Sequence, residues 1–434
     1  MSSTVKTILT AALLFFTSAA SHADQVYVGG DISLLTKYEE HGAIYYDHNG
    51  NKIYSLLPFF KEQGWNAMRV RLFVDPSNAS DTDKEQGVCQ DLDYVVKLCK
   101  RIKQAGFALM LDFHYSDSWA DPSNQWTPQA WQELTDDSLA QQIYDYTASS
   151  LQTLIDSGAT PDMIQTGNEI SYGMCWGSSE SDAKKCYPSS SSENWDRFMK
   201  LLKQATQACR DKCPNAKIIL HSERVSNLSS LQSDNTNYAA LNYWLDKITD
   251  ANINYDIVGL SYYPYYHGPL NCIEGAITTI EEKVPTKKIM VVETGYSLNY
   301  AVSTNYDYTS TYPITDEGQN NFTTDLIEKL ANHSSVTGLF WWWPEANEYG
   351  LDWNTNRVTD KWYNASLFDN ETGKATSALS TLQTFIKKST GISQTTTESL
   401  SKSTDNQWFT VNGMRVDQPD KKGIYIHGGQ KILY

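Results

Sequence analysis

Two glutamates, Glu169 and Glu293, stand where a pair of carboxyl groups could act together. Glu169 follows an apolar run at 163–167, and Glu293 closes a second run at 289–293. Two facing carboxyl groups suit the cleavage of a glycosidic bond, in which one is a protonated acid and the other an ionised nucleophile. The negative charge of one carboxylate favours the protonated form of the other, so their pKa values would separate.

Polar and aromatic side chains of other types end the neighbouring apolar runs. Arg69 lies in the run at 67–73, and its positive charge would keep a nearby carboxylate ionised. Asn168 directly precedes Glu169 and would bond a sugar 2-hydroxyl, a contact that strengthens in the transition state. The other candidates at run ends are His114, His221, Tyr263 and Trp342. Glu223, two residues after His221, is the alternative candidate for a catalytic carboxyl group.

Eight short apolar runs rich in β-branched residues predict buried strands, and longer segments with apolar spacings of three and four predict helices. The runs are 26–30, 67–73, 108–113, 163–167, 217–221, 257–261, 289–293 and 338–342; the helices include 92–102 and segments around 137–156, 194–210, 318–331 and 376–387. This alternation predicts an α/β fold, a closed (β/α)8 TIM barrel, over an open doubly wound sheet, since no glycine-rich nucleotide loop follows an early strand. Catalytic groups of such a barrel lie at the C-terminal ends of its strands.

The charge balance restricts the class of partner. The chain has 35 Lys and Arg against 51 Asp and Glu, a net charge of −16. Such a surface repels phosphate backbones, so no nucleic-acid partner is expected. The 13 Trp and 27 Tyr suit either a large core or flat surfaces that stack on sugar rings. Composition by itself favours the core.

The N-terminus has the features of a signal peptide at 1–23. Lys6 supplies the positive charge, 8–16 form the apolar segment, and 21–23 (Ser-His-Ala) fit a cleavage site with small residues at its first and third positions. The apolar segment is too short to cross a bilayer, and no later segment is long enough, so no membrane span is expected. We expect an exported protein, either secreted, periplasmic or on the cell surface.

Composition changes near residue 390. We expect the catalytic barrel at 24–388, a linker rich in Ser and Thr at 389–407, and a small β tail at 408–434. Gly428-Gly429 between apolar segments predicts a hairpin turn in the tail. The tail resembles the C-terminal segments of secreted Bacteroidetes proteins, several of which serve sorting or anchoring.

The seven cysteines fit structural roles better than metal binding. No CxxC pair and no HExxH motif is present, so no metal site is expected from them. In an oxidising compartment Cys175 and Cys186 are candidates for a local disulfide, and Cys209 and Cys213 for a second. An odd number leaves one thiol over.

The segment 112–122, Asp-Phe-His-Tyr-Ser-Asp-Ser-Trp-Ala-Asp-Pro, with Gln125 after it, resembles the signature of the endo-β-1,4-galactanases, family 53 of the glycoside hydrolases. The resemblance covers roughly 26–385. Further segments that carry it are 30–33 (Gly-Asp-Ile-Ser), 69–76 (Arg-Val-Arg-Leu-Phe-Val-Asp-Pro), 167–170 (Gly-Asn-Glu-Ile), 293–296 (Glu-Thr-Gly-Tyr) and 338–342 (Gly-Leu-Phe-Trp-Trp). The segment at 112–122 is specific to the family, whereas Asn-Glu alone identifies only a larger clan of retaining barrel enzymes.

The resemblance implies roles for these residues. Glu169 would be the acid/base and Glu293 the nucleophile of a retaining hydrolase of internal β-1,4-galactosidic bonds in galactan or arabinogalactan. The implied substrate-binding residues are Asp31, Arg69, His114, Trp119, Asn168, His221, Tyr263 and Trp342, with Trp119 and Trp342 stacking on galactose rings. No cofactor is required, and we expect a monomer.

The chain departs from the family pattern in two places. Many members close the eighth strand with Trp-Glu-Pro, whereas this chain has Trp342-Trp343-Pro344. Some bacterial members hold a structural calcium ion near the loop after the seventh strand. In this chain Asn299, Asp307 and Asp316 lie in that segment without dense spacing of oxygen ligands, which leaves calcium open.

Two alternatives remain at the level of sequence. The first is a secreted carbohydrate-binding protein without hydrolytic activity, which would not need a paired acid and base. The second is a related retaining hydrolase of mannan, cellulose or xylan. A serine hydrolase is disfavoured because no GxSxG motif is present.

Overall fold

The computed structural model describes residues 25–390, apart from 179–182, 188–191, 227–237, 305 and 361–362, together with four short strands of the C-terminal tail. Contacts divide the chain into two units, Met1–Thr390 and Gly391–Tyr434. The predicted signal peptide lies outside the described residues, as does 391–407 of the predicted linker. The boundaries of the four predicted segments therefore stay predictions.

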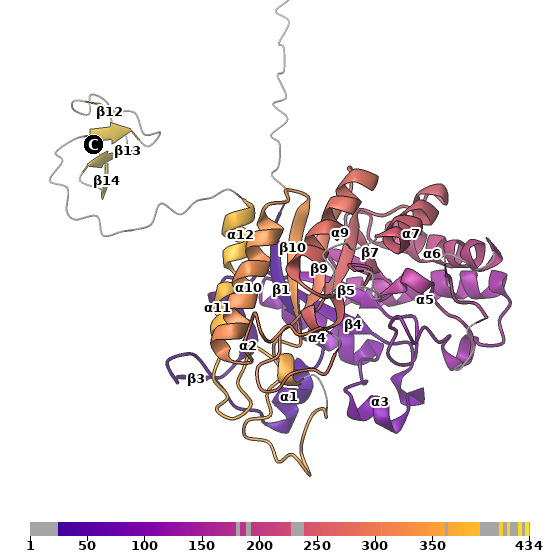
Figure 1. Cartoon of the computed structure of the whole chain (residues 1–434), viewed down its shortest axis with the longest axis horizontal. Helices are drawn as coiled ribbons and strands as arrows, with labels where there is room; N and C mark the ends of the chain where they lie inside the picture. The colour runs from indigo at the N-terminus through magenta and orange to yellow at the C-terminus, as the bar shows by residue number, and fades with distance from the viewer. Residues whose placement is uncertain are drawn as a thin grey trace, which may run out of the picture. The chain divides into compact units, whose positions relative to one another are not determined.

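Eight parallel strands close into a barrel, which confirms the predicted fold (Figure 1). They are β1 (Tyr27–Asp31), β4 (Ala67–Leu72), β5 (Ala108–Phe113), β6 (Met163–Thr166), β7 (Lys217–Ser222), β8 (Ile257–Tyr262), β9 (Lys288–Thr294) and β10 (Val336–Trp342), in the cyclic order β1-β10-β9-β8-β7-β6-β5-β4. Side chains on both faces of these strands are buried, which explains their continuous apolar sequences. Each predicted run matches a strand to within two residues.

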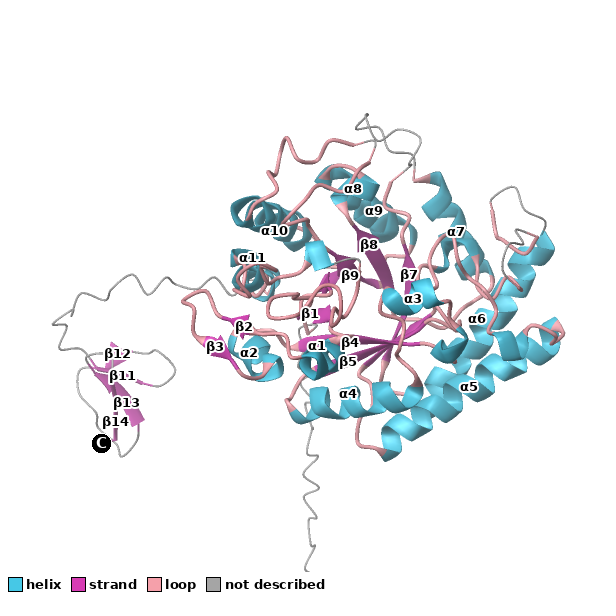
Figure 2. Cartoon of the chain, turned by 90° about the horizontal axis from the view of Figure 1, so that it is seen from below, coloured by secondary structure: helices cyan, strands magenta, loops and turns pink. Residues whose placement is uncertain are grey.

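Helices surround the strands on the outside (Figure 2). The longer ones are α4 (Leu92–Gln104), α5 (Asp136–Asp156), α6 (Ser192–Lys212), α7 (Ala239–Asp250), α9 (Leu270–Lys283) and α10 (Asp316–Ala331). Local signals set their ends: the Asp91 carboxylate accepts the Tyr94 N–H at the start of α4, and Gly106 follows its end with φ +79°. The shorter ones are α1 (Leu35–His41), α2 (Leu56–Glu62), α3 (Asp81–Glu85) and α8 (Pro264–His267).

One predicted helix is divided. The segment around 376–387 forms α11 (Ser377–Thr381) and α12 (Thr384–Ser389). Between them the backbone bonds shorten from four-residue to three-residue spacing, with Phe385 N–H donating to the Leu382 carbonyl at 3.1 Å. This tightening interrupts the regular α-helical ladder.

The inside of the barrel is layered by strand alternation. One layer is apolar and consists of Ala67, Met110, Met163, Ile219, Ile257, Met290, Val292 and Phe340. Two residues further along four of these strands come Arg69, Asp112, Gln165 and His221, all fully buried. Because side chains two apart share a face, the apolar layer carries a polar layer toward the C-terminal ends of the strands.

The C-terminal unit has a four-stranded antiparallel sheet of its own, in the order β12-β11-β13-β14 (Figure 2). Its strands are β11 (Trp408–Thr410), β12 (Arg415–Val416), β13 (Ile424–His427) and β14 (Gln430–Leu433). Pairing of β13 with β14 confirms the predicted hairpin. In the barrel unit, β2 (Tyr45–Tyr46) and β3 (Lys52–Ile53) form a separate two-stranded sheet.

The disulfide predictions are wrong. All seven cysteines are free thiols. Cys175 Sγ points to the Tyr115 carbonyl at 3.5 Å and Cys186 Sγ to the Asn194 carbonyl at 3.3 Å, so the two thiols have different partners. The backbone of Cys213 continues the turn from Cys209 with an N–H to carbonyl bond of 2.8 Å. Side chains one helical turn apart are about 5–6 Å apart at Cβ, beyond the span of a disulfide.

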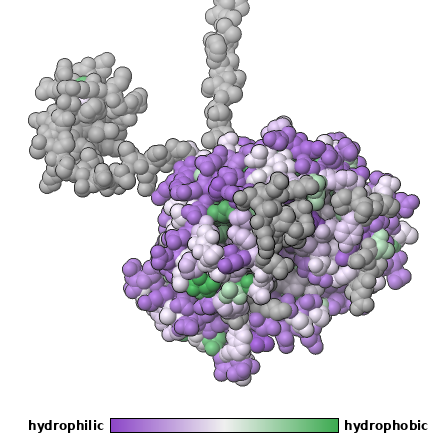
Figure 3. Space-filling view, viewed as in Figure 1, coloured by the Kyte–Doolittle hydropathy of each residue, from purple (hydrophilic) through white to green (hydrophobic). Residues whose placement is uncertain are grey.

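The face of the molecule drawn in Figure 3 is mostly hydrophilic, with small separate hydrophobic patches. Within the described part of the chain, no helix combines the length and the apolar character that a membrane crossing requires.

Candidate active site

Arg69 on β4 is the centre of the polar layer. Its Nη1 lies 2.8 Å from Asp31 Oδ2, and its Nη2 lies 2.7 Å from Asp112 Oδ2 and 2.8 Å from Glu293 Oε1. Nη2 also donates to Asn168 Oδ1 at 3.0 Å. One buried cation therefore binds residues from β1, β5 and β9 and the loop after β6.

Glu293 reaches the mouth of the barrel through an irregularity in β9. Met290 and Val292 both face the inner apolar layer, so strict alternation would turn Glu293 outward. The pairing register with β8 shifts between Leu260 and Ser261, where Ser261 pairs with Glu293. Such a bulge re-aims a side chain, and here it brings the carboxyl group to Arg69.

Two neighbours of Glu293 favour its ionised form against the effect of burial. Burial raises its pKa to about 7, and the positive charge of Arg69 opposes that rise, whereas the charges of Asp112 and Asp31 add to it. The Tyr263 hydroxyl donates a hydrogen bond to Glu293 Oε2 at 3.2 Å, which also favours the charged form. A carboxylate with a cation and a phenol is suited to attack an electrophilic carbon.

A sharp turn after β6 positions Glu169. Gly167 has φ +98° and Glu169 φ +47°, both in the left-handed region. The Glu169 N–H donates to His221 Nδ1 at 3.2 Å, and the Asn168 side chain donates to the Ala120 carbonyl at 2.7 Å. These bonds hold the turn in its strained conformation and direct the Glu169 side chain into the cleft.

Glu169 has the opposite electrostatic surroundings to Glu293. Burial raises its pKa well above the ordinary value, and the negative charges of Glu293 and Glu223 raise it further. A hydrogen bond from the Ser261 hydroxyl opposes this only in part. Glu169 is therefore the group that keeps its proton while Glu293 is ionised.

His221 positions Glu169 and is neutral. Burial lowers its pKa well below the ordinary value, and the charge of Arg69 lowers it further. Because Nδ1 accepts N–H groups from Glu169 and from Gln165 (3.0 Å), the ring proton is on Nε2, which donates to Ser261 Oγ at 2.8 Å. A chain of hydrogen bonds thus leads from His221 through Ser261 to the acid.

His114 and Asp31 lie beneath the cleft rather than in its wall. His114 Nδ1 accepts the Ala120 N–H at 3.1 Å, and its Nε2 lies 3.1 Å from Asp112 Oδ2. Asp31 binds Arg69 and also Arg71, whose Nη1 lies 2.8 Å from Asp31 Oδ1. Both residues hold the groups that line the cleft.

The cleft at the mouth of the barrel has a volume of about 1200 Å³. It is lined by six of the predicted site residues, namely Glu169, Glu293, Asn168, Tyr263, Trp119 and Trp342, and also by Glu223. The Trp119 and Trp342 rings lie 6.2 Å apart. Both are within 4.9 Å of the Arg71 guanidinium, which is fully buried beneath them.

Sequence reasoning missed Gln165 and Ser261 as site residues. Gln165 Nε2 donates to Asp112 Oδ1 at 2.6 Å as well as to His221. Strand alternation could have indicated Gln165, since it lies two residues before Gly167 in the predicted strand at 163–167. Ser261 ends the predicted run at 257–261, but the sequence did not indicate its role, because that role depends on contacts with residues from two other strands.

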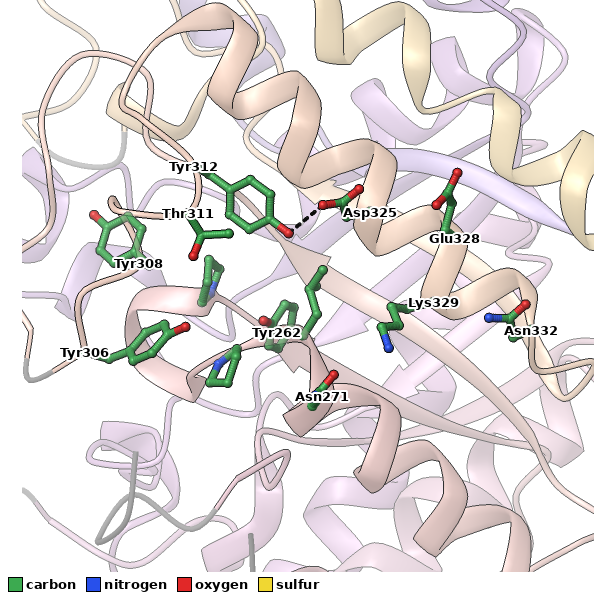
Figure 4. A pocket seen from close by; sticks show the side chains of 13 residues that line it. Tyr262, Asn271, Tyr306, Tyr308, Thr311, Tyr312, Asp325, Glu328, Lys329 and Asn332 are labelled. Atoms are coloured by element: carbon green, nitrogen blue, oxygen red, sulfur yellow. Dashed lines mark hydrogen bonds between the residues drawn. The ribbon is translucent and has the colours of Figure 1, made fainter. Parts of the chain in front are cut away.

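A second cavity of about 420 Å³ lies apart from the acid pair, beside α9 and α10 (Figure 4). Tyr306, Tyr308 and Tyr312 line it, and the Tyr312 hydroxyl donates to Asp325 at 2.8 Å. It contains none of the predicted site residues.

The residues considered for calcium do not converge as ligands. Asp307 accepts bonds from Thr309 within its own turn, and both Asp316 oxygens accept from Ser377. Within the described residues, no cluster of three or more His, Cys, Asp or Glu could hold a metal ion. Calcium binding therefore stays an open prediction, and no step below uses a metal.

Known proteins share this architecture and sequence. The profile of Glycosyl hydrolase family 53 matches residues 27–382. The arabinogalactan endo-β-1,4-galactanase A of Aspergillus niger is 30% identical over 78% of this chain and 89% of its own, and the endo-β-1,4-galactanase of Bacillus subtilis is 27% identical over 79% and 81%. The solved Ignisphaera aggregans GH53 catalytic domain superposes with a TM-score of 0.68 at 30% identity, covering 83% of this chain and 96% of that one. With the acid pair at the barrel mouth, the chain belongs to glycosyl hydrolase family 53 and is a glycoside hydrolase.

Proposed function

We propose that the protein is an endo-β-1,4-galactanase that hydrolyses internal β-1,4-galactosidic bonds of galactan or arabinogalactan with retention. The relatives named above carry this activity in their names. The observation that carries the mechanism is the contrast between the two carboxyl groups of one cleft. Arg69 and Tyr263 oppose the effect of burial, Asp112 and Asp31 on the pKa of Glu293, whereas Glu293 and Glu223 add to the effect of burial on the pKa of Glu169.

In the first step the Glu293 carboxylate attacks the anomeric carbon and forms a glycosyl ester. The bond from that carbon to the leaving oxygen breaks, and Glu169 gives its proton to this oxygen. Once Glu293 is esterified it loses its negative charge. One of the groups that raised the pKa of Glu169 has then gone, so ionised Glu169 becomes a suitable base.

In the second step Glu169 takes a proton from water, and the water oxygen attacks the anomeric carbon. The ester bond to Glu293 breaks, and its electron pair returns to the carboxylate. Two displacements at the same carbon restore its configuration. Arg69 and Tyr263 stabilise the leaving carboxylate as they stabilised the nucleophile.

An internal site on a polymer needs room on both sides of the cleaved bond. The cleft volume of about 1200 Å³ exceeds the usual 300–1,000 Å³ of small-ligand pockets, and aromatic residues line it. Trp119 and Trp342 offer ring faces for stacking. We further propose that the protein is exported through its N-terminal segment and acts as a monomer.

The test is the release of oligosaccharides from a panel of pectic galactan, arabinogalactan, mannan, xylan and cellulose. We expect rapid cleavage of galactan into oligosaccharides with retained β configuration, measured by NMR immediately after cleavage. Glu293→Gln should lose nearly all turnover and keep galactan binding. Cleavage of another polymer in preference, or binding without cleavage by the wild type, would instead favour one of the two alternatives.

A further inference from the structure

After β7 the chain places a nearly buried ion pair in the catalytic cleft. Glu223 and Arg224 directly follow β7, which lies across the barrel from β1. Both line the catalytic cleft. Their side chains are 10% and 15% exposed, and Arg224 Nε lies 3.0 Å from Glu223 Oε1.

The Glu223 carboxyl group has unused hydrogen-bonding capacity. Neither of its oxygens accepts a hydrogen bond of normal geometry from the residues that the structure describes. The nearby Ser171 hydroxyl is paired with Ser222 at 2.7 Å. A buried carboxyl group without such bonds is unfavourable unless a ligand supplies them. The hydroxyl groups of a sugar are donors of this kind.

Tyr172 holds Arg224 in a fixed position. The guanidinium carbon lies 4.0 Å from the centre of the Tyr172 ring, a cation–π contact. Tyr172 is three residues after Glu169 in the same short helical turn, Ile170–Tyr172. The turn that positions the acid therefore also positions the ion pair.

The ion pair lies on the side of the acid rather than of the nucleophile. The charge of Glu223 adds to the effect of burial that raises the pKa of Glu169, whereas burial lowers the pKa of Arg224 to about 10 and the nearby Glu169 carboxylate opposes that fall. By contrast, the groups that act on Glu293 are Arg69, Asp112, Asp31 and Tyr263. A glycosidase acid protonates the leaving-group oxygen, so the leaving sugar occupies the side of the acid.

We infer that Glu223 and Arg224, with Tyr172 as a positioning residue, form the subsite for the leaving-group sugar, the hexopyranose on the reducing-end side of the cleaved bond. Glu223 accepts hydrogen bonds from its hydroxyl groups, and Arg224 donates to its hydroxyl or ring oxygens. This inference rests on the proposed function. Beyond that function, the inference identifies the residues that select the leaving-group sugar in hydrolysis and the acceptor sugar in the transfer reaction.

The experiment compares two substrates that differ only in the leaving group. A β-1,4-galactotetraose places a sugar in the proposed subsite, whereas an aryl β-galactobioside places a phenol there. In Glu223→Gln and Arg224→Lys, the ratio of kcat/KM for the tetraose to that for the aryl glycoside should fall about 10- to 100-fold, the loss of a hydrogen bond to a charged group. Two variants are used so that, if one of them fails to fold, the other still tests the subsite.

Transfer to an acceptor tests the same subsite from the other direction. An acceptor sugar hydroxyl attacks the anomeric carbon of the Glu293 ester, its proton passes to Glu169, and the ester bond breaks with its electron pair returning to Glu293. With galactobiose as acceptor and the aryl galactobioside as donor, the fraction of transfer product should fall about tenfold in both variants.

The matched control is Glu62→Gln, an exposed glutamate at the end of α2. It should keep the wild-type substrate ratio and transfer fraction. Wild-type values of both quantities in Glu223→Gln and Arg224→Lys would overturn the inference. If the wild type cleaves mannan, xylan or cellulose oligosaccharides instead, the galactanase proposal fails, and the same ratio measured with those sugars still tests the subsite.

Discussion

Replacing Arg69 by Met should destabilise the protein strongly and in a pH-dependent way. The substitution removes one buried cation and leaves the three carboxylates Asp31, Asp112 and Glu293, which lie 2.7–2.8 Å from it. Removing one partner of a buried ion pair costs about 3–5 kcal/mol. We expect a loss of this size in the free energy of unfolding at pH 7, measured by urea denaturation with tryptophan fluorescence.

The sign of the pH dependence follows from the same contacts. Without Arg69, burial and mutual repulsion raise the pKa values of Asp112 and Glu293 in the folded state above their unfolded values of about 4. A raised folded pKa destabilises the folded protein at higher pH, and protonation removes that penalty as the pH falls. The deficit of Arg69→Met against wild type should therefore be larger at pH 8 than at pH 5.

The pH dependence of the kinetics should show the effect of removing Arg69 on Glu293. Arg69 opposes the rise in its pKa, so the acid limb of the kcat/KM profile should move to higher pH in a folded variant. Arg69→Lys keeps one positive charge but cannot bridge three carboxylates, so its free energy of unfolding and its acid limb should lie between those of the wild type and those of Arg69→Met. The control is Arg101→Met, because Arg101 forms a partly exposed pair with Glu39 at 2.7 Å and should cost less than about 1 kcal/mol. Equal deficits at both pH values, or an unmoved acid limb, would refute the reasoning.

Two further substitutions test other parts of the structure. Ser261→Ala removes the hydroxyl between His221 and Glu169; since that bond lowers the pKa of Glu169, the alkaline limb of the pH profile should move to higher pH, and an unchanged limb would contradict the assignment. Gly29→Ala adds a Cβ only 2.0 Å from the Ala67 carbonyl oxygen, so the free energy of unfolding should fall by about 1–3 kcal/mol or more. In Gly158→Ala the added Cβ would meet nothing within 4 Å, so its free energy of unfolding should fall only because the backbone has a positive φ there. Equal losses for the two glycines in urea denaturation would show that the close approach in the barrel does not matter.

The strands and most helices were predictable from sequence because their signals are local. Continuous apolar runs bury both faces of each strand, and caps such as Asp91 and Gly106 set the ends of helices within a few residues. The division between α11 and α12 was not predictable, because a change in backbone hydrogen bonding over two residues leaves no strong pattern. The cysteine pairs failed for a related reason: spacing does not show which way two thiols point.

The candidate site was identified mainly by position at strand ends. Glu169, Asn168, Tyr263 and Trp342 were named at or near strand ends and Trp119 through the family resemblance, and all five line one cleft. His114 was named as well but lies beneath the cleft, where it binds Asp112 and the Ala120 backbone. A sequence shows that a residue ends a strand, but not how deep its side chain lies.

The sequence by itself determined the barrel, the residues at its mouth and the pairing of two glutamates. The family resemblance implied which of these glutamates holds a proton, but only the tertiary structure shows the surroundings that favour this assignment. The register shift in β9 turns Glu293 toward Arg69, while the turn after β6 places Glu169 near Glu223 and away from that cation. The physical reason is that a pKa depends on the charges and solvent around a group, and strands distant in sequence bring those charges together when the barrel closes.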